Sequence, residues 1–469
     1  MTYDFGVVGL GVMGENLALN TATHGFSVAG FDVDPARTEL ARQKWAGKPM
    51  TAVSSLKDLA GLLAAPRKIL IMVPAGAPVD QVIGAVAPVL SPGDILIDGG
   101  NSFFRDTERR AKELEPARIR YIGTGVSGGE SGALHGPSIM PGGPEDAYRE
   151  LEPILTAIAA KTQDGPCCAY MGRGGAGHYV KMVHNGIEYG IMQLIAESYD
   201  LMRSALGMTV AEAAQTFAAW NRTDLNSYLI EITAAVLART DPATGRPVVE
   251  MILDRAGQKG TGKWTTQNAL DLGVAVPTID AALEARILSA FKDERAAAAR
   301  ILKGPAPAFS GDRARFLETM RHALWFASLT AYAQGFALMR EASKEYSFGL
   351  NLPEIARIWK GGCIIRSVLL NPIKEALAGG PDLPNLLLDG RFVAQMDEGN
   401  AALREVVANA AQWGIPCLGH AAALGYFDSY RRERLPANLT QAQRDYFGAH
   451  RYERIDRPRG QMFHTEWEE

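Results

Sequence analysis

The chain has 469 residues, enough for about three domains of ordinary size or two large ones. Hydrophobic residues make up 47% of the sequence and charged residues 21%, a balance that excludes an intrinsically disordered chain. The 48 basic and 52 acidic residues leave a formal net charge of −4, which argues against a protein that covers nucleic acid with a broad basic surface.

The four cysteines, Cys167, Cys168, Cys363 and Cys417, show no metal-ligand spacing, and the adjacent pair is unsuited to an ordinary disulfide. This pattern favours a reducing compartment. The first residues lack the basic residues of a signal peptide, and no apolar run approaches the ~18 residues that span a bilayer. We therefore expect a soluble, cytoplasmic protein.

The first part of the chain alternates short β-rich runs with helical stretches, which indicates a parallel sheet with crossover helices. Strands are expected at residues 5–8, 28–31, 69–73, 95–97, 119–122 and 138–140. Helices are expected between them at residues 13–24 and 79–90.

The strand signal almost disappears after the glycine-rich residues 172–177, and helical periodicity takes over. From about Pro436 aliphatic residues become scarce, so the last segment cannot form a core alone. The sequence thus predicts an α/β plus all-α protein: a Rossmann-like, doubly wound domain at 1–176, an all-helical domain at 177–435, and a tail at 436–469 that needs a partner surface.

A dinucleotide-binding fingerprint, Gly9-Leu10-Gly11-Val12-Met13-Gly14, follows the first strand and opens the first helix. Its first glycine makes the tight turn, its second lets the backbone approach a pyrophosphate, and its third lets the helix pack close to the strand. A tight turn without a ligand is the alternative, which the strand–turn–helix context disfavours.

Asp32 stands at the end of the second strand, where a carboxylate accepts hydrogen bonds from the adenosine ribose and repels a 2′-phosphate. NAD is therefore expected in preference to NADP, although Arg37 could reach back and weaken the discrimination. The other interpretation of Asp32, a helix cap, suits Asp34 better because Pro35 follows it.

One long helix is expected at residues 178–203, and at about 100° per residue it groups its polar side chains on one face. That face carries Lys181, His184, Asn185, Glu188 and Tyr189, away from the aliphatic stripe. A solvated Lys–Glu face is the alternative. Beside a nucleotide domain we favour a substrate wall, on which a lysine of lowered pKa acts as base and a glutamic acid of raised pKa returns a proton.

Two turns that follow strand ends are candidate ligand loops, because ligands sit at that edge of open α/β sheets. Asn101 follows a pair of glycines, and Ser127-Gly128-Gly129 exposes backbone donors that suit a carboxylate. Turns without a ligand are the alternative.

Residues 257–264 match a phosphate-binding loop except at Trp264, which replaces the Ser or Thr that ligates magnesium in nucleoside-triphosphate loops. With Lys259, Thr261 and Lys263 the loop still suits a single phosphate, which Arg286 could bind with two hydrogen bonds. An exposed turn without a ligand is the alternative. The eight histidines form no H-E-x-x-H pair, so we expect no catalytic metal.

These motifs resemble the decarboxylating 6-phosphogluconate dehydrogenases of the long, three-part type, over essentially the whole chain. The resemblance rests on residues 7–14, 125–130, 181–189, 257–264, 359–367 and 443–450. It implies oxidation of 6-phospho-D-gluconate to D-ribulose 5-phosphate and CO2 by a nicotinamide cofactor, without a metal, in the oxidative pentose phosphate pathway.

The resemblance also implies residue roles. Lys181 takes the proton of the C3 hydroxyl during hydride transfer and, once protonated, polarises the resulting ketone while CO2 leaves; Glu188 then protonates C1 of the enediol. The carboxylate and hydroxyls are held by Asn101, Ser127, Gly128, Gly129, His184 and Asn185. The phosphate is held by Tyr189, Lys259, Thr261, Arg286 and Arg444. Arg444 and His450 come from the tail of the other subunit, which requires a homodimer.

The chain departs from the family pattern twice, both times in the cofactor pocket. Members that use NADP show Asn-Arg-Thr where this chain has Asp32-Val33-Asp34, so the arginine that meets the 2′-phosphate is missing. The family loop usually has Lys where Pro74 stands in Val73-Pro74-Ala75. We therefore expect NAD, with NADP as the alternative, bound by the fingerprint, residues 32–34, residues 73–75 and Asn101.

Two other functions compete. A related β-hydroxyacid dehydrogenase acting on a non-phosphorylated acid would not need Lys259, Arg286 and Arg444 together. A regulatory protein that senses NAD and binds partners through its tail would bind the cofactor without turnover.

Overall fold

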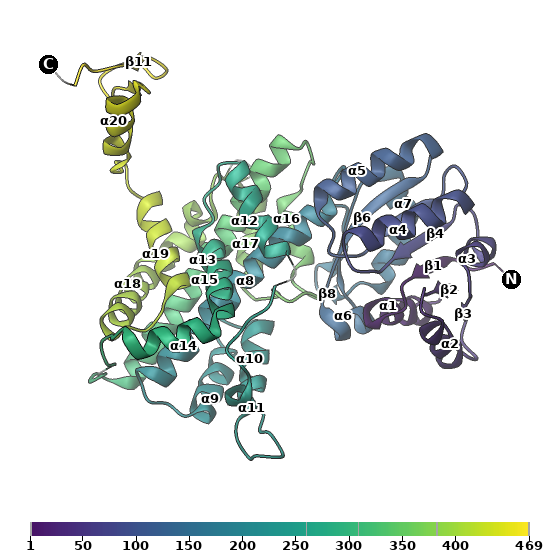
Figure 1. Cartoon of the computed structure of the whole chain (residues 1–469), viewed down its shortest axis with the longest axis horizontal. Helices are drawn as coiled ribbons and strands as arrows, with labels where there is room; N and C mark the ends of the chain where they lie inside the picture. The colour runs from purple at the N-terminus through teal and green to yellow at the C-terminus, as the bar shows by residue number, and fades with distance from the viewer. Residues whose placement is uncertain (1, 259, 308, 381–382, 468–469) are drawn as a thin grey trace. The chain divides into compact units, whose positions relative to one another are not determined.

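The structure, a computed structural model, describes residues 2–258, 260–307, 309–380 and 383–467. It contains two compact units, Met1–Ala423 and Leu424–Glu469. Figure 1 shows a sheet with its helices in the N-terminal part of the first unit and a large set of helices in the rest. Within the described ranges, no helix has both the length and the apolar character needed to cross a membrane. The division at residues 176 and 435 stays a prediction.

A seven-stranded sheet in the order β3-β2-β1-β4-β5-β6-β7 forms the N-terminal part. Its strands are β1 (Phe5–Val8), β2 (Val28–Phe31), β3 (Met50–Ala52), β4 (Lys68–Ile71), β5 (Ile95–Asp98), β6 (Arg120–Ser127) and β7 (Ser138–Gly142). The first six run parallel, and β7 pairs antiparallel with β6. This sheet confirms the Rossmann-like, doubly wound fold.

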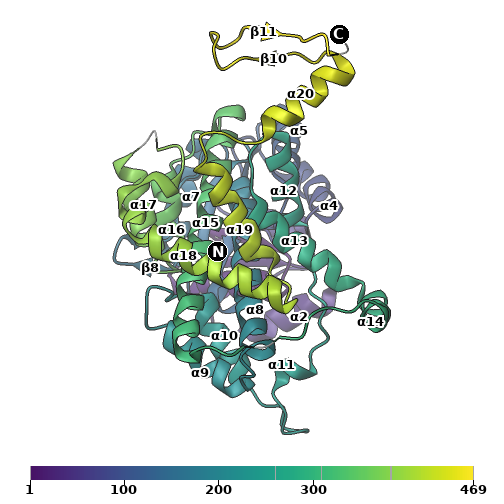
Figure 2. The same cartoon turned by 90° about the vertical axis from the view of Figure 1, so that its left-hand side faces the viewer.

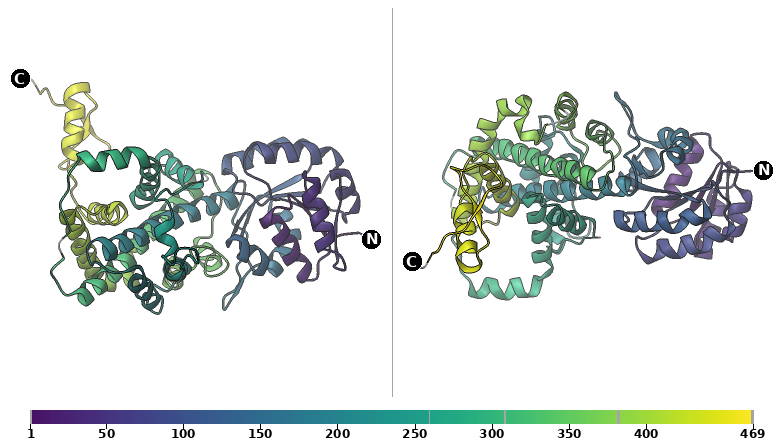
Figure 3. Two further views of the ribbon diagram at one scale, coloured as in Figure 1. Left: turned by 60° about the horizontal axis from the view of Figure 1, so that its bottom comes forward. Right: turned by 90° about the horizontal axis from the view of Figure 1, so that it is seen from above.

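Helices cover both faces of the sheet, as Figure 3 shows. They are α1 (Val12–Thr23), α2 (Pro35–Lys44), α3 (Leu56–Leu62), α4 (Ala77–Val86), α5 (Phe104–Leu114), α6 (Gly129–His135) and α7 (Glu145–Ile158). Strand side chains alternate between the faces. Ile95 and Ile97 of β5 join the core under α1, α2, α6 and α7, while Leu96 joins the core under α3, α4 and α5. The strands are therefore apolar on both sides, as parallel strands require.

Four local features differ from the expectation. β3 was not predicted, because three residues carry too little pattern. The expected parallel order fails at β7, and β6 continues past Ile122 through Gly123 and Gly125, which are poor strand formers. Glycine is needed there because a Cβ on Gly125 would lie 2.4 Å from Lys181 Cβ, where a helix crosses the strand. The helix expected at 79–90 is α-helical as far as Val86 and continues as a 3-10 helix, η1 (Ala87–Val89), because Pro88 has no N–H with which to extend the α-helical hydrogen bonds.

After α7 the strands β8 (Lys161–Thr162) and β9 (Gly165–Pro166) form a small antiparallel pair. From Ala176 onward the first unit is helical, as predicted. Its helices are α8 (Ala176–Ser204), α9 (Val210–Trp220), α10 (Tyr228–Ala238), α11 (Val248–Met251), α12 (Thr261–Asp271), α13 (Pro277–Ala290), α14 (Lys292–Ile301), α15 (Arg313–Glu345), α16 (Leu352–Ile358), α17 (Leu370–Gly379), α18 (Gly390–Trp413) and the start of α19 (Leu418–Tyr430), whose residues from Leu424 on belong to the second unit. The long helix α8 has almost the expected bounds. It packs on α15, where Gly335 leaves room for Ile187: a Cβ there would lie 2.5 Å from Ile187 Cδ1.

The second unit contains α20 (Ala437–Gly448) and a hairpin of β10 (Tyr452–Glu453) and β11 (Met462–Phe463), visible in Figure 2. Its centre is polar, as the scarcity of aliphatic residues suggested. The buried Asp445 accepts hydrogen bonds from the backbone N–H groups of Arg451 and Thr465 and from the indole of Trp467, at 2.8, 3.1 and 3.0 Å. One carboxylate thus ties the helix to both sides of the hairpin.

Candidate active site

The polar face of α8 predicted from helical period exists and is buried. Lys181, His184, Asn185 and Tyr189 are all buried, and the Glu188 side chain is 18% exposed. This excludes the solvated-face alternative. The burial arises because the first turns of α8 cross β6 and β7 at glycines and the middle of the helix packs on α12.

Among the described residues, the hydrogen-bond partners of the Lys181 amine are uncharged. Its Nζ lies 3.4 Å from Ser127 Oγ and 3.4 Å from His184 Nδ1, and it donates a short hydrogen bond to Asn185 Oδ1. Burial lowers the pKa of Lys181 from its ordinary value, although the charge of Glu188 acts in the opposite direction. An amine in this setting is prepared to lose its proton and act as a base.

His184 connects these groups. Its Nε2 lies 3.3 Å from Ser127 Oγ, and its Nδ1 lies 3.1 Å from Asn185 Oδ1 and 3.7 Å from Glu188 Oε2. Burial, together with the charge of Lys181, holds the pKa of His184 well below 6.5, so the ring is neutral. Asn185 Nδ2 donates to Thr261 Oγ1 at 2.9 Å, which joins α8 to the start of α12.

Glu188 is shifted in the opposite sense to Lys181. Burial raises the pKa of Glu188, and the charges of Lys181 and Arg286 offset only part of this effect. The Arg286 guanidinium lies 3.5 Å from the centre of the Tyr189 ring and donates to the Gly257 carbonyl at 3.0 Å. A lysine of lowered pKa and a carboxyl of raised pKa on one wall are the environment-tuned pair expected of an acid–base site.

The turn Ser127-Gly128-Gly129, at the end of β6, forms the side of this site that belongs to the sheet. Ser127 is the last residue of β6, and Gly128 and Gly129 have φ values of 121° and 63°, which favour glycine. A Cβ on Gly128 would lie 2.6 Å from the Gly362 carbonyl oxygen, and that same oxygen accepts a hydrogen bond from Ser138 N at 2.7 Å. The supporting role of Gly362 was missed from sequence, although the Gly361–Gly362 pair signals a close backbone approach.

The fingerprint glycines behave as predicted. Gly9 has φ 96°, and a Cβ on Gly14 would lie 1.8 Å from the Gly9 carbonyl oxygen, so the helix packs directly on the turn. At Gly11 a Cβ would meet only Arg37 Nη1, at 3.4 Å, which leaves this side of the turn open for a pyrophosphate. The cradle therefore fits a dinucleotide.

Asp32 is buried and faces the turn: its Oδ2 accepts from Leu10 N at 2.7 Å, and its Oδ1 accepts from Asp34 N at 2.8 Å. Asp34 caps α2, as expected, by accepting from Ala36 N at 2.9 Å. Arg37 does reach back: its Nη1 lies 3.9 Å from Asp32 Oδ2, and its side chain is 54% exposed.

The remaining predicted residues fall into three groups. Asn101, Val12, Val33 and Pro74 are exposed, so a ligand can reach them, while Met13, Val73 and Ala75 are half-buried. Lys259 lies outside the described residues. Arg444 and His450 belong to the second unit, where Arg444 Nη1 donates to Gln441 Oε1 at 3.0 Å, and their part in the site stays a prediction.

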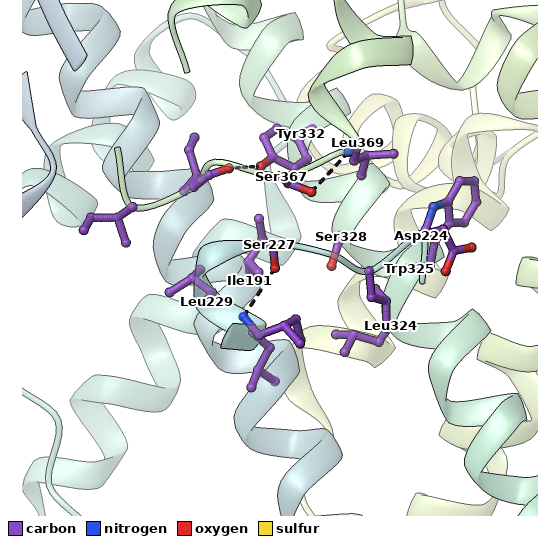
Figure 4. A pocket seen from close by; sticks show the side chains of 15 residues that line it. Ile191, Asp224, Ser227, Leu229, Leu324, Trp325, Ser328, Tyr332, Ser367 and Leu369 are labelled. Atoms are coloured by element: carbon purple, nitrogen blue, oxygen red, sulfur yellow. Dashed lines mark hydrogen bonds between the residues drawn. The ribbon is translucent and has the colours of Figure 1, made fainter. Parts of the chain in front are cut away.

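A cavity lies on the aliphatic side of α8, lined by Ile191 and Ile195 together with Tyr332 and Ile365 (Figure 4). Tyr332 donates from its hydroxyl to the Ile365 carbonyl at 2.7 Å. With about 20 Å³ it holds one or two water molecules and cannot hold a sugar phosphate. The buried Lys181 and Glu188, with pKa values shifted in opposite directions, make the polar side of α8 the candidate active site.

Comparison with known proteins agrees with this geometry. Residues 4–172 match the NAD binding domain of 6-phosphogluconate dehydrogenase, and residues 177–467 match the 6-phosphogluconate dehydrogenase C-terminal domain. The chain belongs to the 6-phosphogluconate dehydrogenase family. The family resemblance expected from the sequence is thereby confirmed.

Relatives in this family align along the entire chain. It is 56% identical to "6-phosphogluconate dehydrogenase, decarboxylating" of Synechococcus elongatus, covering 99% of both chains. It is 51% identical to "6-phosphogluconate dehydrogenase, NADP(+)-dependent, decarboxylating" of Bacillus subtilis, covering 98% of both. A Plasmodium falciparum 6-phosphogluconate dehydrogenase, studied in its apo form, with NADP+ and with 6-phosphogluconate, superimposes with a TM-score of 0.93 at 42% identity, covering 99% of this chain and 100% of that one.

Proposed function

We propose that the chain oxidises and decarboxylates 6-phospho-D-gluconate to D-ribulose 5-phosphate and CO2, with reduction of NAD or NADP. The observation that carries the proposal is the buried pair Lys181 and Glu188, whose pKa values are shifted in opposite directions beside Ser127. Full-length similarity to decarboxylating 6-phosphogluconate dehydrogenases supports it.

The side chains support a metal-independent sequence of proton movements. Neutral Lys181 accepts the proton of the substrate C3 hydroxyl, while the bound nicotinamide supplies the hydride acceptor. The resulting ammonium donates a hydrogen bond to the new C3 ketone and stabilises the negative charge that develops on its oxygen as CO2 leaves. Burial raises the pKa of Glu188 and so favours the protonated form, which then delivers a proton to C1 of the enediol. Neutral His184 and Asn185 orient Lys181.

The test is the near-ultraviolet absorbance of reduced cofactor after 6-phosphogluconate is mixed with the protein. We expect turnover with 6-phosphogluconate and none with unphosphorylated gluconate or 3-hydroxyisobutyrate. Arg286→Ala should raise the KM for 6-phosphogluconate by about 10- to 100-fold, the loss typical of a charge-assisted phosphate contact. Turnover of the unphosphorylated acids that survives in Arg286→Ala would instead support a β-hydroxyacid dehydrogenase.

NAD is our proposed preferred cofactor. The buried Asp32 carboxylate supports it, as does Val33, an uncharged side chain that is 87% exposed where NADP users carry arginine. The Bacillus subtilis relative is named as NADP(+)-dependent and the Plasmodium falciparum enzyme binds NADP+, so the proposal is that this chain has diverged from them at residues 32–34.

The ratio of kcat/KM for NAD to that for NADP decides this proposal. We expect a ratio above one, which the double variant Asp32→Asn, Val33→Arg should reverse. Arg37→Ala is the matched probe of the arginine that approaches Asp32 at the turn: it should reduce use of NADP and leave use of NAD nearly unchanged. A wild-type ratio below one would overturn the preference and make Arg37 the 2′-phosphate ligand.

We also propose a homodimer in which Arg444 and His450 complete the active site of the other subunit. The exposed Tyr446 and Phe447 beside Arg444 support it, since such apolar side chains favour contact with another surface. Light scattering measures the dimer. Mixing inactive Lys181→Met with weakly active Arg444→Ala should restore activity, because hybrid dimers contain one intact site. No restoration would mean that the tail serves its own subunit.

A further inference from the structure

A buried network of polar side chains lies behind the proposed site, between β5 and α5. Asp98 ends β5 and Arg110 lies on α5, and both side chains are 0% exposed. Asp98 Oδ2 accepts from Ser102 Oγ at 2.6 Å and from the Tyr121 hydroxyl at 2.9 Å, and Arg110 Nη1 lies 3.4 Å away. Burying an ion pair is costly, and replacement by apolar side chains is often neutral or stabilising, so stability alone does not explain it.

The network touches two loops that face the proposed cofactor and substrate. Arg110 Nη2 donates to the carbonyl of Gly76 at 3.1 Å, which fixes the end of the loop that follows β4, residues 73–76. Asp98 Oδ1 accepts from Gly100 N at 3.0 Å while its Oδ2 holds Ser102. The residue between these two anchors is Asn101.

The same network reaches the catalytic helix. His178 lies on α8, one turn before Lys181. Its Nε2 is 3.1 Å from the Asp98 carbonyl oxygen, and its Nδ1 is 2.6 Å from Thr107 Oγ1 on α5. Burial lowers the pKa of His178, so the ring is neutral and serves to connect the strand, α5 and α8.

We propose that Arg110 and Asp98 are positioning residues that hold the 73–76 loop, the loop around Asn101 and α8 in the mutual arrangement that cofactor binding and hydride transfer require. The inference rests on the proposed function for its kinetic readout. Arginine suits this role because its planar guanidinium can contact three partners at once. Its Nε donates to Asp80 Oδ1 at 2.8 Å, its Nη1 approaches Asp98, and its Nη2 donates to the Gly76 carbonyl. A lysine has one charged nitrogen and cannot make all three contacts.

The neighbouring Arg109 provides a matched control on the same helix. It shares Asp80, with Nη2 2.9 Å from Asp80 Oδ1, but its side chain is 44% exposed, and its hydrogen bonds are to Asp80 and Glu113 rather than to Asp98 or Gly76. Arg109→Lys therefore disturbs the shared ion pair and leaves the loop contacts in place. Arg110→Lys keeps the positive charge and removes the fork.

The experiment compares the full-length wild type, Arg110→Lys, Arg109→Lys and the milder Ser102→Ala in three measurements. These are steady-state kinetics with each substrate varied, calorimetric binding of 6-phosphogluconate alone, and thermal melting. We expect Arg110→Lys to lower kcat/KM for the nicotinamide cofactor by roughly 10- to 100-fold, the loss that follows from small misplacement of reacting groups. Ser102→Ala should lower it by roughly threefold, and Arg109→Lys by less than twofold.

A merely structural role predicts a different pattern. It would lower the melting temperature of Arg110→Lys and affect the cofactor and 6-phosphogluconate alike. The positioning role instead predicts that the calorimetric Kd for 6-phosphogluconate changes by less than about threefold. If folded Arg110→Lys and Ser102→Ala both keep wild-type cofactor kinetics, or if Arg109→Lys matches Arg110→Lys, the inference is wrong. If Arg110→Lys fails to fold, the cofactor kinetics of Ser102→Ala alone test the inference.

Failure of the proposed function is distinguishable from failure of this inference. If the wild type does not turn over 6-phosphogluconate, calorimetric binding of NAD and NADP to the same variants takes the place of the kinetics. Weaker cofactor binding by Arg110→Lys than by Arg109→Lys would then support the positioning role, and equal binding would overturn it.

Discussion

Helix α8 contains two glutamates in its two halves, and they behave in opposite ways. Glu188 lies in the candidate active site and Glu197 lies towards the far end of the helix, where α19 begins. Both side chains are largely buried. Burial raises the pKa of Glu188. At Glu197 burial acts the same way, but hydrogen bonds from His420, Gln193 and Gly419 N outweigh it and hold its pKa below the usual range.

The difference lies in the donors aimed at each carboxylate. Glu197 accepts from Gly419 N at 2.7 Å, from His420 N at 3.0 Å and from Gln193 Nε2 at 2.9 Å, and His420 Nδ1 lies 2.7 Å away. Glu188 has the neutral His184 ring at 3.7 Å, with the charges of Lys181 and Arg286 acting only through space. The structural carboxylate of Glu197 is thus compensated by several donors, whereas Glu188 has few donors among the described residues, which favours its protonated form.

The largest expected effect is on Lys181. Lys181→Met should lower kcat by about 10³-fold or more, because it removes both the base and the ammonium that polarises the ketone. Cofactor affinity, measured by calorimetry, should change little, since Lys181 contacts Ser127, His184 and Asn185 and not the fingerprint turn. Activity within tenfold of wild type would remove Lys181 from the mechanism.

Glu188→Gln should lower kcat by about 10²- to 10³-fold, through loss of the final proton donor. The pH dependence of kcat/KM should be bell-shaped in the wild type, because Lys181 must be neutral and Glu188 protonated, and the pair titrates together. Since glutamine does not titrate in this range, the variant should lose one limb of the bell. Retention of both limbs would assign the acid to another group.

The variant Glu197→Gln tests the structural role of the second glutamate. It should destabilise the protein by about 1–3 kcal/mol, because one oxygen that accepts buried hydrogen bonds becomes a donor facing His420 or Gly419 N. Its kcat should stay within about threefold of wild type. Thermal melting and steady-state kinetics on the same preparations measure both quantities. Loss of activity without loss of stability would contradict the structural role of Glu197.

The smallest expected effect is on the pH dependence of stability, where the two glutamates should differ in sign. The folded-state pKa of Glu197 is lowered, so its contribution is present above its unfolded pKa and is lost as pH falls through the folded value. The folded-state pKa of Glu188 is raised, so its contribution is present below its unfolded pKa and is lost as pH rises through the folded value.

Melting curves between acidic and neutral pH should therefore separate the variants. Glu197→Gln should reduce the acid sensitivity of the melting temperature. Glu188→Gln should melt at or above the wild-type temperature at neutral pH, as expected when a carboxylate is kept at a site for function rather than stability. A lower neutral melting temperature for Glu188→Gln would indicate that Glu188 is a structural ion-pair partner.

Local patterns were predicted well. The fingerprint turn, the Asp34 cap and the polar face of α8 all depend on residues within a few positions of one another, where backbone geometry follows directly from spacing. A strand was expected at 138–140, but the antiparallel direction of β7 was missed because strand pairing depends on contacts distant in sequence. The glycines that continue β6 are explained only by α8 crossing them.

The sequence by itself determined the dinucleotide turn, the helical period that puts Lys181 and Glu188 on one side of α8, and the family. Only the tertiary structure decided which of these groups are buried and what faces them: neutral partners for Lys181, few donors for Glu188, several donors for Glu197, and a buried Asp98–Arg110 pair behind the loops. The physical reason is that spacing fixes direction along one element, whereas desolvation and hydrogen-bond donors come from other elements, and these set whether a side chain carries a charge or a proton.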